Sequence, residues 1–534
     1  MTTLSDFSTI NLNKLNGKNP ARLENCVNGK WYTPSKSVVV PDPLNGEPFI
    51  VAPDTQPDEL LPFIESMKMV PKTGTHNIYK SPERFQLYGD INRRVAQALH
   101  VPEIEDFFTK CIQRVMPKSR IQAAGEVIVV RKFFENFSGD NVRMLMRGFF
   151  QAGDHEGQRT MGHRWPYGPV AIISPFNFPL EIPVMQFAAA AMVGNKPVVK
   201  AESRTALPVE QFLRLMHACG LPKDAIDLIH CKGSVMSDLL TRVDFRMTQF
   251  TGGMTAAHKV TEATKGKVKL EDAGFDWKIL GPIRRKPEDD IEKMVSYVAW
   301  QCDQDAYAMA GQKCSAQSML LLHDDWESLG FLDRIAEQAK RRNLSELTLS
   351  PVLSHTNDDI KAHIKALLEI PGSKLLFGGK PLEGHSIPSQ YGSFEPTAVL
   401  VDLSAMLSSD RFFETATTEL FGPLQIIVKW NNSLEPKLLE ALERIDAHLT
   451  AAVVSNDPEF VNRMLGHTVN GTTYAGIRAR TTGAPQNHWF GPAGTPLAAG
   501  IGTPEAVLST WTCHREIVFD EGPISSSWTL PPPS

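Results

Sequence analysis

The chain has 534 residues, which at about 150 residues per domain indicates more than one domain. Its 55 basic and 60 acidic residues give a net charge of −5, and 42% of the residues are hydrophobic, as in an ordinary globular protein. No basic block interleaved with aromatic residues occurs, and no apolar run reaches the length of about 18 residues that crosses a bilayer. We therefore expect neither a nucleic acid nor a membrane as partner.

The cysteines and the N-terminal segment bear on the compartment. The seven cysteines are scattered, odd in number and free of CxxC spacing, which favours reduced thiols inside a cell and predicts no metal site. Residues 1–23 lack the apolar core of a secretory signal peptide. Their bases Lys14, Lys18 and Arg22 match a mitochondrial transit peptide only weakly, and a floppy terminus explains them equally well.

Residues 167–272 alternate between strand-like and helix-like segments. Strands are predicted at 170–174, in GNKPVVK up to Lys200, and at 227–230, 245–250 and 268–270, and helices at 180–193, 208–219, 234–240 and 254–264. Such alternation is typical of an α/β fold with a parallel sheet wound by right-handed crossovers. Ligands of such sheets bind at the carboxyl ends of the strands.

A second α/β region is predicted downstream, between a helix at 288–303 and residue 456. It has strand-like segments at 318–325, 397–403, 423–430 and 450–456 and helix-like segments at 331–342 and 435–445. From Gly471 the chain is rich in Gly, Pro and Thr, as in loops that carry binding sites, and the last segment, 525–534, is expected to be extended.

Six short motifs lie near predicted strand ends or turns. They are ISPFNFP (173–179), GNKPVVK (194–200), FTGG (250–253), LEDAG (270–274), GQKCSA (311–316) and ELFGP (419–423). Their order and spacing resemble the NAD(P)-dependent aldehyde dehydrogenase superfamily over nearly the whole chain. GQKCSAQS, NGTTYAG and RTTGAPQNHWFGPAG are similar to the plant-type members of its glutamate-semialdehyde (1-pyrroline-5-carboxylate) dehydrogenase branch.

The resemblance implies a fold in three parts. The expected division is a Rossmann-like NAD-binding domain (1–150 and 168–298), an α/β catalytic domain (299–495), and a small β oligomerisation flap with the C-terminal tail (151–167 and 496–534). It also implies a homo-oligomer, a dimer or higher, in the mitochondrial matrix, with the cytoplasm as the alternative.

The implied reaction is NAD-dependent oxidation of L-glutamate 5-semialdehyde to L-glutamate in proline catabolism. Cys314 is the expected nucleophile, which forms a thiohemiacetal and then a thioester. Asn177 is expected to bind the oxyanion together with the Cys314 N–H, although an Asx turn also explains an asparagine in this loop. Glu271 is the expected general base for thioester hydrolysis, and Cys302, inside a predicted helix, is expected to pack in the core.

The resemblance also assigns cofactor-binding residues. Lys200 should bind the adenosine ribose, Glu419 the nicotinamide ribose, and Gly252 and Gly253 the phosphates, although a tight turn explains the glycine pair equally well. The remaining expected contacts are Ser174, Phe176, Ser203 and Phe421. Ser203 stands where the family usually has an acidic residue and Glu202 comes one place early, so NADP stays open beside NAD.

For the substrate, Phe178 should form an aromatic wall, and Ser315 should reach the carboxylate, as should the backbone of Gly491, Pro492 and Ala493. Lys313 either favours the Cys314 thiolate or is structural. Surface ion pairing is favoured over a substrate-clamping role for two further cations, Arg478 and Arg480.

Three rival functions remain. One is a dehydrogenase for another acidic semialdehyde, such as succinate semialdehyde. A non-catalytic cofactor-binding scaffold is the second, and the intact set of Asn177, Glu271 and Cys314 speaks against it. The third is a thioester-forming hydrolase without cofactor, which Lys200, Gly252 and Glu419 disfavour.

Overall fold

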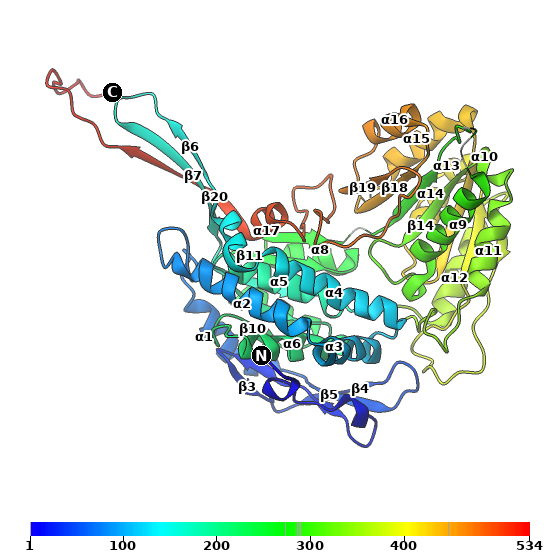
Figure 1. Ribbon diagram of the computed structural model, residues 1–534, viewed down its shortest axis with the longest axis horizontal. Coiled ribbons are helices and arrows are strands. Elements are labelled where there is room, and N and C mark those ends of the chain that lie inside the picture. The colour runs from blue at the N-terminus through cyan, green and yellow to red at the C-terminus, as the bar shows by residue number, and fades with distance from the viewer. Residues whose placement is uncertain (1, 273, 286, 288–289, 447) are drawn as a thin grey trace.

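The computed structural model describes residues 2–272, 274–285, 287, 290–446 and 448–534. Two seven-stranded sheets, each with its own helices, form two lobes, and a narrow three-stranded arm projects from one of the lobes (Figure 1). The α/β fold predicted from the sequence is confirmed. Ala273 of the LEDAG motif and the first residues of the helix expected at 288–303 lie outside the described residues.

The first large sheet has the order β12-β11-β8-β9-β10-β2-β3. Its first five strands run parallel, and β2 and β3 extend it antiparallel. The strands are β2 (Asn25–Val27), β3 (Lys30–Tyr32), β8 (Pro169–Ile173), β9 (Lys196–Lys200), β10 (Asp227–Ile229), β11 (Met247–Thr251) and β12 (Val268–Glu271). The helices between them are α5 (Glu181–Met192), α6 (Leu207–Ala218), α7 (Gly233–Arg242) and α8 (Met254–Ala263).

This lobe confirms the elements predicted between residues 167 and 272, because each apolar run there ends in a recognisable turn. The parallel pairing brings the ends of β8, β9, β11 and β12 to one edge, so that Ile173, Lys200 and Glu271 lie at the same side of the sheet. All residues of α5 are buried, as expected for a helix that is apolar all round.

Helices that the sequence analysis did not predict cover the first sheet. They are α1 (Leu61–Lys68), α2 (Glu83–Leu99), α3 (Pro102–Val115) and α4 (Arg120–Asn136). Helix α4 packs against α5, and α3 packs against α6 (Figure 1). A small sheet beside them has the order β1-β5-β4, formed by β1 (Ala21–Arg22), β5 (Pro48–Pro53) and β4 (Ser37–Pro41).

The second large sheet has the order β15-β16-β17-β14-β13-β18-β19, with only the β15–β16 pair antiparallel. Its strands are β13 (Asp276–Leu280), β14 (Gln317–His323), β15 (Lys374–Phe377), β16 (Thr397–Val401), β17 (Leu424–Trp430), β18 (Thr450–Val454) and β19 (Thr472–Ala475). Its helices are α9 (Ile291–Tyr307), α10 (Asp324–Glu327), α11 (Phe331–Lys340), α12 (Asn357–Leu368), α13 (Leu403–Leu407), α14 (Asp410–Thr417), α15 (Glu435–Arg444) and α16 (Pro458–Gly466).

Strand β13 lies centrally in this second sheet, between β14 and β18, although the expected division put its residues in the cofactor domain. The division into domains stays a prediction. Cys302 is fully buried on α9, as expected of a core cysteine.

The arm joins two segments that lie far apart in the chain. Strand β20 (Thr512–Asp520), which follows α17 (Pro504–Trp511), pairs antiparallel with β7 (Gln158–Pro166), and β6 (Phe149–Ala152) lies on the other side of β7. The segments expected to form the flap are therefore neighbours, and their role in oligomerisation stays a prediction. None of the helices in the described ranges is long and apolar enough to span a membrane.

Candidate active site

Cys314 follows a turn with unusual backbone geometry. Met309, Ala310 and Gly311 have φ values of 59°, 52° and 70°, in the left-handed region. At Gly311 a Cβ atom would lie 2.1 Å from the carbonyl oxygen of Gly422, so only glycine fits at this position. The close approach fixes the cysteine turn against the ELFGP motif, and its strained backbone is of the kind that accompanies functional sites.

Glu271 ends β12 and lies beside the Cys314 thiol. It is 4% exposed, and its Oε1 has no hydrogen-bond partner within the described structure. Burial raises the pKa of Glu271 to about 7, and the Cys314 thiol opposes this only in part. Burial and then Glu271 raise the pKa of the Cys314 thiol well above its usual range. The resting pair is thus a protonated thiol next to a base whose pKa suits neutral pH.

Asn177 is buried in the loop between β8 and α5, and a buried ion pair holds that loop. Lys118 Nζ donates to the Asn177 carbonyl oxygen at 2.9 Å and lies 3.0 Å from Glu126 Oε2. Glu126 Oε1 in turn accepts from the N–H groups of Leu180 and Glu181 at 2.8 and 3.0 Å. The sequence analysis missed this pair, which fixes the loop that presents the Asn177 amide.

The Cys314 side chain opens into a cavity between the two lobes. Phe178, Lys313 and Ser315 line it, so the structure brings these three predicted substrate residues together. Gly491, Pro492 and Ala493 are not among its lining residues, and the Ala493 N–H donates to the His448 carbonyl oxygen at 3.1 Å. The loop that borders the cavity is instead 482–485, part of the RTTGAPQNHWFGPAG motif, to which the sequence analysis assigned no substrate contact.

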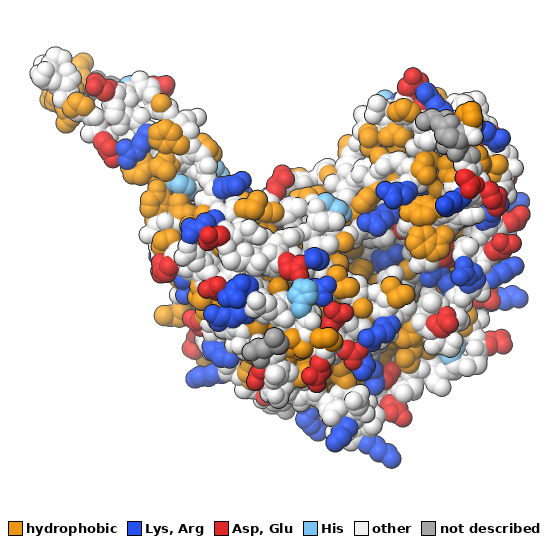
Figure 2. All heavy atoms as spheres, viewed as in Figure 1, with side chains coloured by type: hydrophobic (Ala, Val, Ile, Leu, Met, Phe, Trp, Pro, Cys, Tyr) orange, Lys and Arg blue, Asp and Glu red, His pale blue; other side chains and the backbone are white. Residues whose placement is uncertain are grey.

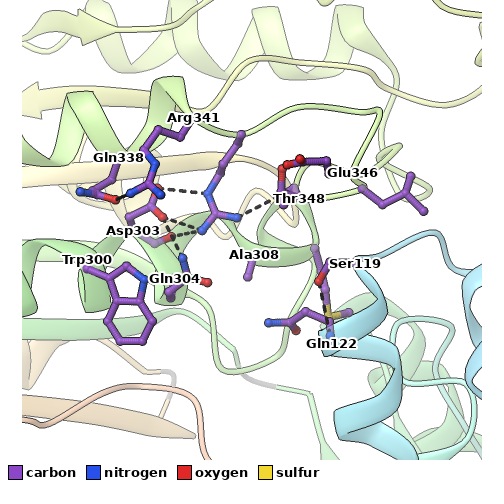
Figure 3. A pocket seen from close by; sticks show the side chains of 13 residues that line it. Ser119, Gln122, Trp300, Asp303, Gln304, Ala308, Gln338, Arg341, Glu346 and Thr348 are labelled. Carbon is purple, nitrogen blue, oxygen red and sulfur yellow. Dashed lines mark hydrogen bonds and ion pairs between the residues drawn. The ribbon is translucent and has the colours of Figure 1, made fainter.

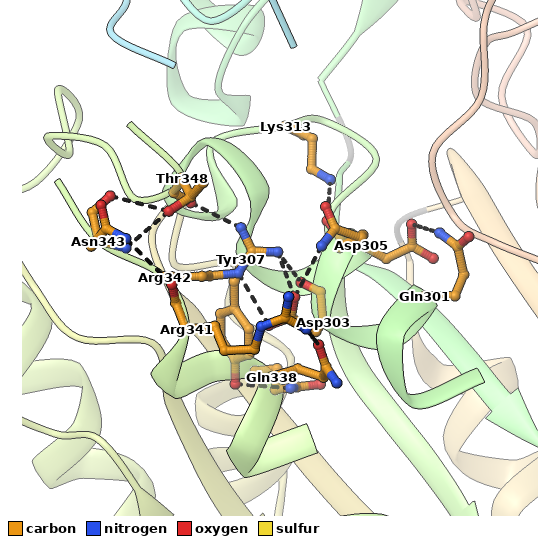
Figure 4. A network of polar contacts seen from close by, with 12 residues as sticks. Gln301, Asp303, Asp305, Tyr307, Lys313, Gln338, Arg341, Arg342, Asn343 and Thr348 are labelled. Atoms are coloured by element: carbon orange, nitrogen blue, oxygen red, sulfur yellow. Dashed lines mark hydrogen bonds and ion pairs between the residues drawn. The ribbon is translucent and has the colours of Figure 1, made fainter. Parts of the chain in front are cut away.

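Lys313 extends into a polar network (Figure 4). Its Nζ donates to the Gln304 carbonyl oxygen at 2.9 Å, and burial lowers its pKa to about 8 in spite of nearby Asp305. Asp305 Oδ2 accepts from Lys278 Nζ at 2.6 Å and from the Thr481 N–H at 2.9 Å. This network ties the cysteine turn to the 482–485 loop, which favours the structural alternative for Lys313.

A second hollow adjoins the cavity and shares Gln122 and Gln304 with it (Figure 3). Its main charges are already paired, because the Arg342 guanidinium grips Asp303 at 3.1 and 2.6 Å and donates to the Thr348 carbonyl oxygen. The residues of this hollow therefore support the cysteine turn structurally.

The chain is similar to known proteins over most of its length. The profile of the aldehyde dehydrogenase family matches residues 34–494. The chain belongs to the aldehyde dehydrogenase family. It is 53% identical over 526 residues to delta-1-pyrroline-5-carboxylate dehydrogenase 12A1, mitochondrial, of Arabidopsis thaliana, covering 98% of this chain and 93% of that protein. A probable aldehyde dehydrogenase of Linum usitatissimum is also 53% identical, over 98% and 94% of the two chains.

Solved structures show the same aldehyde dehydrogenase fold. An NAD-dependent aldehyde dehydrogenase from Sinorhizobium meliloti superposes with a TM-score of 0.80 at 17% identity, over 98% of this chain and all of that one. A betaine aldehyde dehydrogenase from Staphylococcus aureus gives 0.77 at 18%, over 96% and 99% of the two chains.

The residues expected to bind a dinucleotide in this aldehyde dehydrogenase fit such a ligand. Within the described residues, the buried Ser174 Oγ has no hydrogen-bond partner. The carboxyl group of Glu419 likewise forms no hydrogen bond there. Burial raises the pKa of Glu419 to about 7. Gly253 caps α8, and open space lies where its Cβ would be, while Lys200 ends β9 nearby. Unpaired polar groups suit ribose hydroxyls, and a helix N-terminus suits phosphates.

Phe176 and Phe421 meet edge to face, with ring centroids 5.8 Å apart. The Arg204 guanidinium lies 5.3 Å from the Phe176 ring centroid and forms an ion pair with Glu202 at 2.5 Å. Glu202 is thus already engaged, and Ser203 begins a short 3-10 turn beside it.

The Cys314 cavity is also lined by one residue that the sequence analysis missed and by one that it assigned to surface ion pairs. Arg480 lines it, with the guanidinium 5.9 Å from the Tyr474 ring centroid, and neither Arg480 nor Arg478 forms an ion pair within the described residues. The favoured surface ion pairs are therefore not observed. From α5, Glu181 also lines the cavity. A charged residue at the start of an otherwise apolar helix is the sequence feature that points to it.

Proposed function

We propose that this chain is an NAD-dependent dehydrogenase that oxidises L-glutamate 5-semialdehyde, the open form of 1-pyrroline-5-carboxylate, to L-glutamate in proline catabolism. The observation that carries the proposal is the pairing of Cys314 with Glu271 at a cavity that Phe178, Ser315 and Arg480 also line. The substrate follows from 53% identity, over nearly the whole chain, to a protein named for 1-pyrroline-5-carboxylate. Succinate semialdehyde is not favoured as the substrate.

The reaction begins at sulfur. The Cys314 thiol loses its proton, for which the adjacent Glu271 carboxylate is an acceptor, and the sulfur attacks the aldehyde carbon. The Asn177 amide and the Cys314 N–H stabilise the oxyanion, and the Lys118–Glu126 pair holds the Asn177 loop in place. Lys200, Gly253 and Glu419 would hold NAD, which would supply the acceptor for the hydride that leaves the thiohemiacetal carbon as the thioester forms. After it has released the thiol proton to solvent, Glu271 activates the water that hydrolyses the thioester and releases glutamate.

The α-carboxylate of the substrate is assigned to Arg480 and Ser315, which line the cavity. A guanidinium binds a carboxylate through two parallel hydrogen bonds, and a hydroxyl adds a third. The backbone of Gly491, Pro492 and Ala493 remains a second candidate, since closure around a ligand can redirect a loop.

NAD is the proposed cofactor. Glu202 adds an acid near the adenosine ribose, and an acid repels a 2′-phosphate, but Arg204 neutralises much of its charge. The preference for NAD over NADP is therefore modest.

The proposed assembly is a homo-oligomer built through the arm. Apolar side chains gather there (Figure 2), and Phe149 and Phe150 are 51% and 64% exposed. The outer edges of β6 and β20 lack a partner strand within the described structure. Exposed apolar surface and open strand edges are features of sheets that pair with another chain. The proposed compartment is the mitochondrial matrix, in line with the name of the Arabidopsis relative.

One assay tests the substrate assignment. NADH formation is measured with 1-pyrroline-5-carboxylate, succinate semialdehyde and propanal at matched concentrations. The proposal expects the highest kcat/KM for 1-pyrroline-5-carboxylate. A higher value for succinate semialdehyde or propanal would refute the substrate assignment.

A further inference from the structure

Glu181 is a buried carboxyl that the mechanism above does not use. It is the first residue of α5, a helix whose residues are all buried, and it is itself 8% exposed. Its side chain lines the Cys314 cavity. Across the described part of the chain, nothing forms a hydrogen bond or an ion pair with its carboxyl oxygens. Buried polar groups are almost always paired, so an unpaired carboxyl facing a ligand cavity indicates a missing ligand group.

The neighbouring charges do not supply that partner. Lys118 is the nearby cation, but its Nζ is committed to Glu126 and to the Asn177 carbonyl oxygen. Glu126 uses both of its oxygens, for Lys118 and for the N–H groups at the start of α5. Burial raises the pKa of Glu181 well above its usual range, Glu126 and Glu271 raise it further, and Lys118 opposes them. Burial and the two neighbouring carboxylates thus favour the neutral form of the Glu181 carboxyl when the cavity holds no cation.

We infer that Glu181 binds the α-ammonium group of the substrate and makes the enzyme selective for an amino-acid aldehyde. The inference rests on the proposed function, in which the substrate carries an aldehyde, a carboxylate and an ammonium group. The first two groups have partners in Cys314 and Arg480, both of which line the same cavity as Glu181. Glu181 is the partner of the ammonium group, and an ion pair of this kind is stronger where water is excluded.

The proton balance of this step is simple. As the ammonium group enters, the Glu181 carboxyl releases its proton to solvent and becomes a carboxylate, so that the buried pair is neutral as a whole. A substrate with only methylene at the α-position leaves the carboxyl protonated and gains nothing from it. Glu181 therefore discriminates between glutamate 5-semialdehyde and 5-oxopentanoate, which has the same length, aldehyde and carboxylate but no amino group.

The test compares these two aldehydes in the wild type and in Glu181→Gln. The variant keeps the shape and a polar end without charge, and it replaces a carboxyl whose neutral form is favoured by burial, so its thermal stability should match that of the wild type. We expect kcat/KM for glutamate 5-semialdehyde to fall about 10- to 100-fold, the size of one hydrogen bond to a charged group. The value for 5-oxopentanoate should stay within about 3-fold.

Gln122→Ala serves as the matched control, because Gln122 lines the same cavity and carries no charge. It should change kcat/KM for both aldehydes by the same factor. Equal losses for both aldehydes in Glu181→Gln would overturn the inference, since they would mean that the carboxyl donates to the shared carboxylate or only supports the helix.

Equilibrium binding to the wild type provides a measurement that needs no variant. Calorimetry in buffers of different ionisation enthalpy counts the protons released when L-glutamate or glutarate binds near pH 7. We expect about one more proton released with L-glutamate than with glutarate, because only the ammonium group ionises Glu181. Equal proton release would contradict the inference. Failure of the proposed function looks different, because the wild type would then prefer another aldehyde over glutamate 5-semialdehyde.

Discussion

The Glu271→Gln variant separates the two halves of the proposed reaction. The amide keeps the size of the side chain but has no basic oxygen. Deacylation loses the only group assigned to activate water. Acylation is affected in two opposing ways, because the thiol loses a proton acceptor and also the negative charge that raises its pKa. We therefore expect deacylation to slow far more than hydride transfer.

The size of the effect follows from the role. A positioned general base is worth about 10²- to 10⁴-fold in rate, which corresponds to a barrier of about 3 to 5 kcal/mol. The pKa of about 7 makes Glu271 an efficient base at neutral pH, so the loss should lie within that range.

Rapid mixing of the variant with NAD and substrate should give a burst of NADH close to one per active site, followed by a slow steady rate. The acyl group should accumulate on Cys314 and appear in the mass of the intact protein. Asp272→Asn is the control, since it removes the carboxylate next in the chain, and it should keep a steady rate near that of the wild type.

A different outcome would refute this reasoning. If the first turnover itself becomes slow and no adduct appears, Glu271 acts in thiol activation and not in hydrolysis. The steady-state rate alone does not separate the two roles, because both can produce the same loss.

Four further outcomes are expected. Cys314→Ala should abolish turnover and keep NAD binding by calorimetry, whereas Cys302→Ala, in the core, should lose only thermal stability. In the wild type, kcat should rise with pH and level off above about 7 as Glu271 ionises. Because burial raises the pKa of this carboxyl from 4.5 to about 7 in the fold, its neutral form is favoured and stability falls as pH rises between these values. Glu271→Gln should therefore raise the free energy of unfolding in urea at pH 8 by up to about 3 kcal/mol, and little at pH 5. Finally, kcat/KM should favour NAD over NADP by about tenfold, or ~1.4 kcal/mol; equal values would mean that Ser203 outweighs Glu202.

The first sheet was predictable because its local patterns agree with its tertiary structure. Each strand there is a short apolar run followed by a turn, so the positions of Lys200 and Glu271 at one edge follow from pattern and parallel pairing alone. Strand β13 escaped prediction because Lys278 interrupts its apolar pattern. That charge is tolerated only because Asp305 on α9 pairs with it, at 2.6 Å, and such a distant partner is invisible in one sequence.

The reactive pair was predictable from the sequence, but the residues of the cavity wall were not. The motifs around Cys314 and Glu271 are local and resemble a family. The wall is assembled from α4, α5 and the 482–485 loop, which meet only in the folded chain. Lys118 and Glu126 have no motif of their own, and their role becomes visible only where both reach the Asn177 loop.

Three carboxyl groups around the site are all buried and incompletely hydrogen-bonded. This shared property links the stability of the protein to the binding of its ligands. Burial raises the pKa values of Glu271, Glu419 and Glu181, and within the described residues each keeps at least one carboxyl oxygen without a hydrogen bond. Under the proposed assignments each carboxyl group binds a different partner. Glu271 binds water, Glu419 binds ribose hydroxyls and Glu181 binds an ammonium group. The free protein bears the cost of these unpaired groups, and each partner offsets part of it by supplying the missing hydrogen bonds. Binding energy is thus concentrated at the groups that orient the substrate and the cofactor for reaction.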